Sequence, residues 1–155
     1  MTYTQIASVT VSSAVSTVTI TSLDQGYRDL VFVINGISNS WSNINGQFNG
    51  DSSQNYSQMR LQGYLNTANA YPVSNIDVMR VGWNIGPTIW EVFDYSQTGK
   101  YRTTLGQSGH PNEDVTSLNA STWKNTSNAV TSVKFDCAGN NWESGTTIMC
   151  YGIEA

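Results

Sequence analysis

The run of residues 29–35, Asp-Leu-Val-Phe-Val-Ile-Asn, constrains the fold more than any other stretch of this 155-residue chain. It is the only long uninterrupted run of large apolar residues, whereas the other candidate strands alternate, at least in part, between apolar and polar side chains. An alternating strand has one wet face, but a continuous run of β-branched and aromatic residues has both faces covered. The run therefore predicts a central strand, packed against a second layer on one side and against loops or a partner on the other.

The rest of the chain reads as short strands separated by turns rich in Gly, Asn and Ser, with no convincing amphipathic helix. One example is the stretch 58–62, which alternates cleanly as a half-buried strand does. The polar stretches 38–56 and 106–120 read as loops, and the stretch 65–71, closed by Pro72, reads as a loop or a single helical turn. This spacing predicts a single all-β domain over residues 1–155. We expect an antiparallel β-sandwich, jelly-roll-like, with about eight or nine strands.

The charge of the chain excludes two classes of partner. Charged residues make up only 12% of the sequence, the formal net charge is −4 and the isoelectric point is about 4.6. Nucleic acid and anionic membrane surfaces both attract a surplus of Lys and Arg, so neither is expected as a partner. No window approaches the roughly 20 apolar residues of a spanning helix. Residues 1–5 show no signal peptide, which predicts either another export route or assembly in a cytosol.

Residues able to support catalysis or metal binding are sparse. His110 is the only histidine, and it precedes Pro111 in a polar loop without a nucleophile-elbow pattern. Cys137 and Cys150 sit at alternating strand positions among apolar neighbours, which favours two buried free thiols over a disulfide. No carboxylate pair can be assigned for glycoside cleavage. We therefore expect no enzyme activity, no metal and no cofactor.

The aromatic residues are the more informative group, with five tryptophans and eight tyrosines on a weakly charged scaffold. Exposed aromatic rings on a β-sandwich can stack on sugar rings or anchor protein interfaces. Trp83, Trp90 and Trp123 read as core residues. Trp41 and Trp142 lie in loop-like stretches, where an interface role and a packing role are equally compatible with the sequence. For the turn at residues 49–51, turn geometry is favoured over calcium binding.

Four stretches of the chain, taken together and in order, match those of a known group of proteins. They are Ser13-Ala14 through Tyr27-x-Asp29-Leu30-Val31-Phe32-Val33; Phe48-Asn49-Gly50-Asp51-Ser52-x-x-Asn55-Tyr56-Ser57; Asp94-Tyr95-Ser96-x-Thr98-x-Lys100-Tyr101-Arg102-Thr103; and Trp123-x-x-Thr126 through Ala129-Val130-Thr131-Ser132-Val133, closing on Gly145-Thr146-Thr147 and Cys150-Tyr151-Gly152-Ile153. On these stretches the chain resembles a family of small β-sandwich proteins of tailed bacteriophages, which occur alone or at the ends of longer virion proteins. At Met149-Cys150 the chain departs from the plain apolar residues more frequent in that family.

The resemblance implies a virion structural component and transfers no catalytic residue. Our first hypothesis is a non-enzymatic capsid decoration or cement protein on the particle surface, assembled in the host cytoplasm. Its partners would be copies of itself, possibly in a homotrimer, and the major capsid protein or other virion proteins. The alternative is a tail-fibre or adhesin-like module that binds host surface glycan; a glycan-cleaving enzyme would need a carboxylate pair that the sequence does not reveal. The candidate interface or glycan-contact residues are Trp41, Phe48, Asn49, Asp51, Tyr56 and Trp142.

Overall fold

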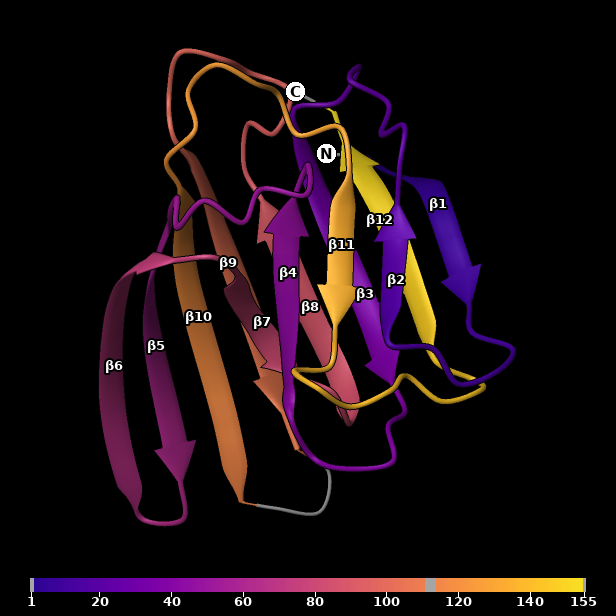
Figure 1. The fold of residues 1–155 in the computed structure, drawn as a ribbon, viewed down its shortest axis with the longest axis vertical. Helices are drawn as coiled ribbons and strands as arrows, with labels where there is room; N and C mark the ends of the chain where they lie inside the picture. Colours follow the sequence, from indigo (N-terminus) through magenta and orange to yellow (C-terminus); the bar gives the residue numbers. More distant parts are fainter. Residues whose placement is uncertain (1, 111–113, 155) are drawn as a thin grey trace.

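In the computed structural model, which describes residues 2–110 and 114–154, the chain forms antiparallel strands in two sheets (Figure 1). No helix occurs in these two ranges. The strands are β1 (Tyr3–Thr10), β2 (Thr17–Ile20), β3 (Asp29–Gly36), β4 (Asn43–Phe48), β5 (Tyr56–Tyr64), β6 (Thr67–Ile76), β7 (Met79–Trp83), β8 (Gly86–Val92), β9 (Arg102–Gly109), β10 (Val115–Trp123), β11 (Val133–Asp136) and β12 (Thr147–Ile153).

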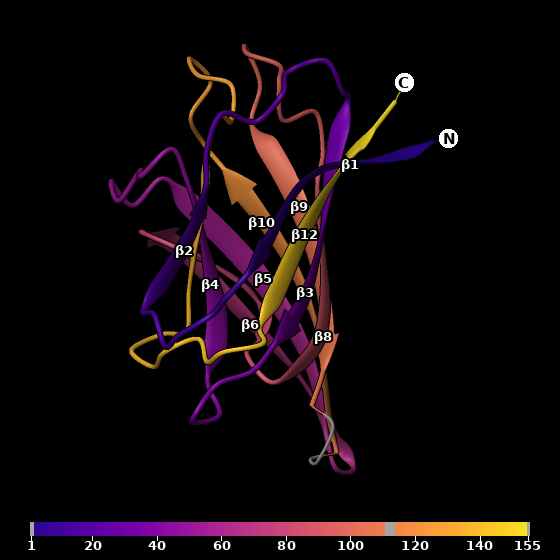
Figure 2. The same ribbon diagram turned by 90° about the vertical axis from the view of Figure 1, so that its right-hand side faces the viewer.

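The strand order is that of a jelly roll with an extension. One sheet has the order β1-β12-β3-β8-β9-β10-β5-β6, and the other has the order β2-β11-β4-β7. The first four strands of the large sheet face the small sheet, as the side view shows (Figure 2), and strand β7 of the small sheet also packs on β9 and β10. Eight strands arranged in this way form a jelly roll. Because β1 pairs with β12, the two termini lie side by side (Figure 2). The predicted all-β, jelly-roll-like sandwich is confirmed.

The extension consists of two hairpins added to the free side of β8. The β5–β6 hairpin lies between β4 and β7 in the sequence, and the β9–β10 hairpin lies between β8 and β11. In space they form one block with the order β9-β10-β5-β6, which we call the arm. The arm extends the large sheet beyond the small one (Figure 1).

The predicted count of eight or nine strands is wrong, because the structure has 12 strands. The three stretches read as loop or helical turn all contain strand residues. Strand β4 lies inside 38–56, and Ile44 and Phe48 on it are fully buried. Strand β6 covers most of 65–71 and carries Pro72 in its middle, which an edge strand tolerates. Strand β10 begins inside 106–120.

The prediction of a central strand at residues 29–35 is confirmed. Strand β3 pairs with β12 on one side and with β8 on the other. Leu30, Phe32 and Ile34 point into the sandwich and are fully buried. The ring of Phe32 lies 5.5 Å from that of Trp90 and 5.3 Å from that of Phe135, measured between centroids, so it joins the two sheets. On the other face of β3, Val31 is also buried.

Candidate functional site

Three of the six candidate contact residues belong to the core. Phe48, Tyr56 and Trp142 are fully buried. Phe48 stacks on Trp90 with ring centroids 5.4 Å apart, and its backbone N–H donates to the hydroxyl of Tyr56 at 3.0 Å. A fully buried ring cannot stack on a sugar at the surface, so the contact prediction for these three residues is wrong. The error arose because β4 and the bridge from Trp142 to Val15 lie in stretches that look like polar loops.

Asn49 and Asp51 organise the turn after β4. Asn49 has φ 52° and Gly50 has φ 68°, the left-handed pair of a tight turn. The side-chain oxygen of Asn49 accepts hydrogen bonds from the backbone N–H of Thr131 at 2.8 Å and of Ser132 at 3.1 Å. Asn49 therefore ties the turn to the segment before β11, which is a structural role.

The carboxylate of Asp51 anchors the same turn. It accepts hydrogen bonds from the indole N–H of Trp123 at 2.7 Å and from the amide of Asn55 at 3.0 Å. Burial acts to raise the pKa of Asp51, but these bonds, with those from Ser53, outweigh it and hold the pKa below its ordinary value. The sequence interpretation of residues 49–51 as turn geometry agrees with these contacts.

Trp41 is the one predicted contact aromatic at the surface, with 46% of its area exposed. Its ring packs on that of Trp83 at 4.9 Å between centroids and meets the ring of His110 edge-on at 5.7 Å. On the other side, the guanidinium of Arg80 lies 5.6 Å from the Trp83 ring. Trp41 is thus an exposed ring that its neighbours support. We call the series Trp41, Trp83 and Arg80 the row.

The row leads from Arg80 into a depression of about 390 Å³ beside strand β7. One wall is the inner face of the β5–β6 hairpin, which β7 does not cover, and the other is β7 with its neighbour β4. The guanidinium of Arg60 stacks over the ring of Tyr71 at 4.3 Å on the first wall. The lining residues are Asn45, Gln58, Arg60, Tyr71, Val73, Ile76, Asp77, Val78 and Arg80.

The arm shows an inverted pattern of burial. On β10, Leu118 is 39% exposed while Asn119 is fully buried, and on β5, Leu61 is 48% exposed while Gln58 is 8% exposed. The prediction of a half-buried strand at 58–62 is confirmed, but its buried face is the polar one. The buried inward residues of β5, β9 and β10 include Gln58, Thr104, Ser108, Ser117, Asn119 and Ser121.

A hydrogen-bond network makes this polar interior possible. The side chains of Ser108 and Ser117 bond at 2.9 Å, Asn119 donates to Ser117 at 3.2 Å, and Gln58 donates to Asn119 at 3.2 Å. Buried polar groups are tolerated when they are paired in this way, whereas the hydroxyls of Thr104 and Ser121 are buried and have no hydrogen-bond partner among the described residues. Although Tyr56, Val115 and Trp123 point inward and are buried, a set of exposed apolar residues of the arm lies on its other side. We call that side the arm outer face; its outward positions include Met59, Leu61, Ala70, Pro72, Leu105, Leu118 and Ala120.

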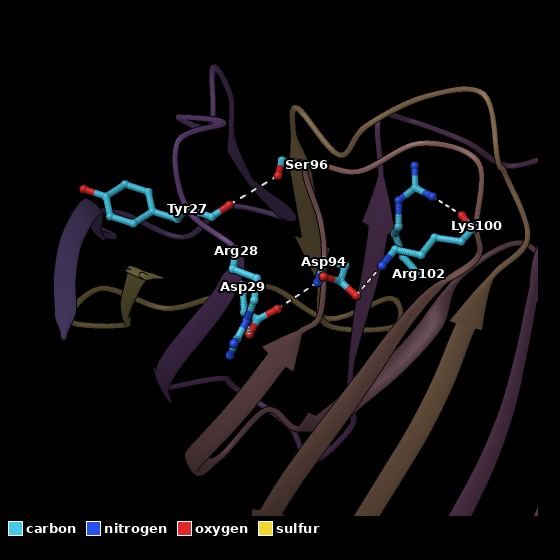
Figure 3. A network of polar contacts seen from close by, with 7 residues as sticks. All are labelled: Tyr27, Arg28, Asp29, Asp94, Ser96, Lys100 and Arg102. Carbon is cyan, nitrogen blue, oxygen red and sulfur yellow. Dashed lines mark hydrogen bonds and ion pairs between the residues drawn. The ribbon is translucent and has the colours of Figure 1, made fainter. Parts of the chain in front are cut away.

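A second polar cluster fastens the connection between β8 and β9 (Figure 3). The carboxylate of Asp29 accepts from Arg28 at 2.7 Å and from the backbone N–H of Asp94, whose own carboxylate pairs with Lys100 at 2.6 Å. Arg102 is fully buried and donates to the backbone carbonyls of Lys100 and Asn128. Each charge in this cluster has a partner in the chain, so the cluster serves the fold.

The cysteines are free and buried, as predicted. Burial raises the pKa of each thiol to about 12, which leaves Cys137 and Cys150 protonated and unreactive near neutral pH. Within residues 2–110 and 114–154, no three His, Cys, Asp or Glu side chains lie close enough to share a metal ion. The same residues form no helix long and apolar enough to cross a membrane.

No known family model matches the chain, and no curated protein matches it. Its function is therefore inferred from its own residues and their arrangement. Two surfaces stand out: the arm outer face, and the row from Trp41 to the depression beside β7. Arg60, Arg80 and Tyr71 were not among the predicted site residues. Pairing of β5 with β6 places Arg60 beside Tyr71, and packing of the two sheets brings Arg80 on β7 to them. No spacing in the sequence indicates this arrangement.

Proposed function

We propose that this chain is a non-enzymatic structural protein of a bacteriophage virion, which decorates the capsid and associates with copies of itself through the arm outer face. The observation that carries the proposal is the inverted burial of the arm. A strand normally turns its apolar side chains to the core. Here Leu61 and Leu118 point away from it, while Gln58 and Asn119 are buried.

This arrangement is favourable when the outer face is covered. Burying apolar surface contributes about 25 cal/mol per Å² removed from water, and the isolated chain does not gain this at Met59, Leu61 and Leu118, which are 42%, 48% and 39% exposed. Contiguous apolar patches on the surface of a soluble protein commonly mark an interaction site. A partner seated on the arm outer face would supply the missing burial.

A second copy of the chain fits this face. The outward positions of β5, β6, β9 and β10 carry no charged residue, although the chain as a whole has a net charge of −4. Acidic copies repel one another in general, but an uncharged apolar face is self-complementary, as a symmetric interface requires. The edge strands β1 and β6 also contain no charged residue, whereas charges at the edge are a usual protection against pairing.

The virion assignment comes from the resemblance described above, and the shape is compatible with it. Co-sedimentation tests the assignment. Purified protein is mixed separately with capsids stripped of accessory proteins and with intact host cells. We expect saturable binding to the capsids. Binding to cells alone, competed by free surface polysaccharide, would overturn the decoration role in favour of the alternative.

The alternative, a module that binds host surface glycan, is favoured by one observation. Trp41 is exposed, and Trp83 and His110 hold its ring in place. A fixed aromatic face is what a sugar ring can stack on. The substitution Trp41→Ala should then abolish binding to cells without changing the fold. Unchanged cell binding by this variant would contradict the glycan role at this position.

A further inference from the structure

Arg60 on β5 and Arg80 on β7 differ from the other two arginines of the chain, Arg28 and Arg102, which belong to the polar cluster of Figure 3. The chain has only seven basic residues. Arg28 and Lys100 pair with carboxylates, and Arg102 is fixed by backbone carbonyls. Within the described part of the chain, neither Arg60 nor Arg80 forms an ion pair, and both line the depression beside β7. An acidic protein thus presents two uncompensated guanidinium groups in one concave place.

Both guanidinium groups are oriented by aromatic rings. Arg60 lies 4.3 Å from the centroid of Tyr71, and Arg80 lies 5.6 Å from that of Trp83. An arginine stacked on a ring keeps its N–H groups free at the edge of the guanidinium plane, where they match the two oxygens of a carboxylate. Stacking also reduces the conformational freedom that a long side chain would lose on binding.

The backbone under Arg80 is equally well fixed. The side-chain amide of Gln58 donates to the carbonyl of Arg80 at 2.8 Å and accepts from its N–H at 3.1 Å. These bonds hold the β7 wall against the β5 wall, so the two arginines keep a constant spacing. A preformed spacing of this kind is typical of a binding site rather than of mobile surface charges.

The other lining groups suit a hydroxyl-rich ligand. Asn45 donates to Asp136 at 2.9 Å and retains its own carbonyl oxygen, and the exposed Asp77 offers a carboxylate. Both oxygens can accept hydrogen bonds from sugar hydroxyls. The negative charges of Asp77 and of Asp136, the hydrogen-bond partner of Asn45, oppose an anion, and the two arginines offset them. Val73 adds an apolar surface for the face of a ring.

We propose that this depression binds a saccharide that bears a carboxylate, with Arg60 and Arg80 on the carboxylate and the exposed ring of Trp41, which the buried Trp83 supports, on a neighbouring sugar ring. The inference rests on the alternative glycan-binding function and names its ligand class. It is independent of the decoration role.

Calorimetric titration tests this inference with three probes: tetragalacturonate, sialyllactose and neutral maltotetraose. The acidic probes should bind the wild-type protein, and maltotetraose should bind more weakly. Arg60→Gln and Arg80→Gln should each weaken binding of the acidic probes by about tenfold or more. The matched control is Arg28→Gln, which removes an arginine already paired with Asp29 and should leave the affinity unchanged. Denaturation midpoints of the variants check that the fold is intact.

The possible failures are distinguishable. Equal weakening by Arg28→Gln would mean attraction to overall charge and would overturn the inference. If maltotetraose binds as well as the acidic probes and only Trp41→Ala abolishes binding, the glycan function stands and the carboxylate site falls. If no probe binds at millimolar concentration, both fall, and the decoration role is unaffected.

Discussion

The side-chain amide of Gln58 pairs with both backbone groups of Arg80, as a neighbouring strand would. Gln58 lies on β5 of the large sheet and Arg80 on β7, the edge strand of the small sheet. The two bonds measure 2.8 and 3.1 Å. They occupy a free strand edge that could otherwise pair with another chain. They also join β5 of the arm to β7 of the small sheet, in addition to the strand pairing of β8 with β9 and the bond from Asn119 to the carbonyl of Val81.

We expect Gln58→Ala to lower the free energy of unfolding by about 1–3 kcal/mol, because it leaves the backbone groups of Arg80 without these partners. Urea denaturation measures the change. Gln62→Ala, on the same strand and on the same face, is the control and should change stability by less than about 0.5 kcal/mol. Equal effects of the two substitutions would show that the pairing with Arg80 contributes nothing.

Phe32→Ala should be the most destabilising of these substitutions, by about 3–5 kcal/mol, because it removes a fully buried ring that contacts both sheets. Val33→Ala is the control on the other face of β3 and should cost much less. Chemical denaturation again provides the measurement. An unchanged midpoint for Phe32→Ala would be incompatible with β3 as the central strand.

Gly50→Val tests the turn between β4 and β5. Gly50 has φ 68°, and no atom lies within 4 Å of the position where a Cβ would stand. The cost should therefore come from backbone strain alone, about 1–2 kcal/mol. Gly50→Asn, which tolerates the left-handed conformation better, should cost less. Equal stability of the valine variant and the wild type, measured by thermal unfolding, would rule out this strain.

The lowered pKa of Asp51 predicts a loss of stability in acid. Its folded-state pKa lies below the ordinary value of 3.8, so the stabilisation is complete above pH 3.8 and is lost as the pH falls through the folded value. Asp51→Asn should therefore be less stable than the wild type at pH 7, and the difference should shrink at pH 2. The exposed Asp77→Asn is the control. A difference that is independent of pH would exclude a contribution from the charge.

Most of the jelly roll was predictable because its strands, apart from β4, obey the usual pattern. Leu30, Phe32 and Ile34 on β3, and Ile148 and Cys150 on β12, are apolar and point inward. The arm was not predictable in full, because Ser117 and Asn119 occupy the inward positions that an apolar pattern would mark. A strand whose interior is satisfied by hydrogen bonds resembles a polar loop when the sequence is read alone.

The residues of the candidate site were likewise predictable only in part. Trp41 was identified because an aromatic residue in a polar stretch is conspicuous. Phe48 and Tyr56 were misjudged because the strand that buries Phe48 was read as loop. Arg60 and Arg80 lie 20 positions apart and on different sheets, and only the packing of β7 on the arm, which includes the bonds from Gln58, brings their walls together. One sequence signal can be recognised only once the fold is known. On β5, polar residues alternate with Met59 and Leu61, and the strand face that carries these two apolar residues has no charged residue.

Sedimentation equilibrium over a wide concentration range tests the central claim, that the arm outer face is a contact surface between copies. The account predicts reversible association of the wild-type chain and a monomer for the double variant Leu61→Ser/Leu118→Ser. Leu65→Ser, at the 64% exposed tip of the β5–β6 hairpin, should associate like the wild type. A wild-type chain that stays monomeric at every concentration, or a double variant that associates as tightly as the wild type, would contradict the account.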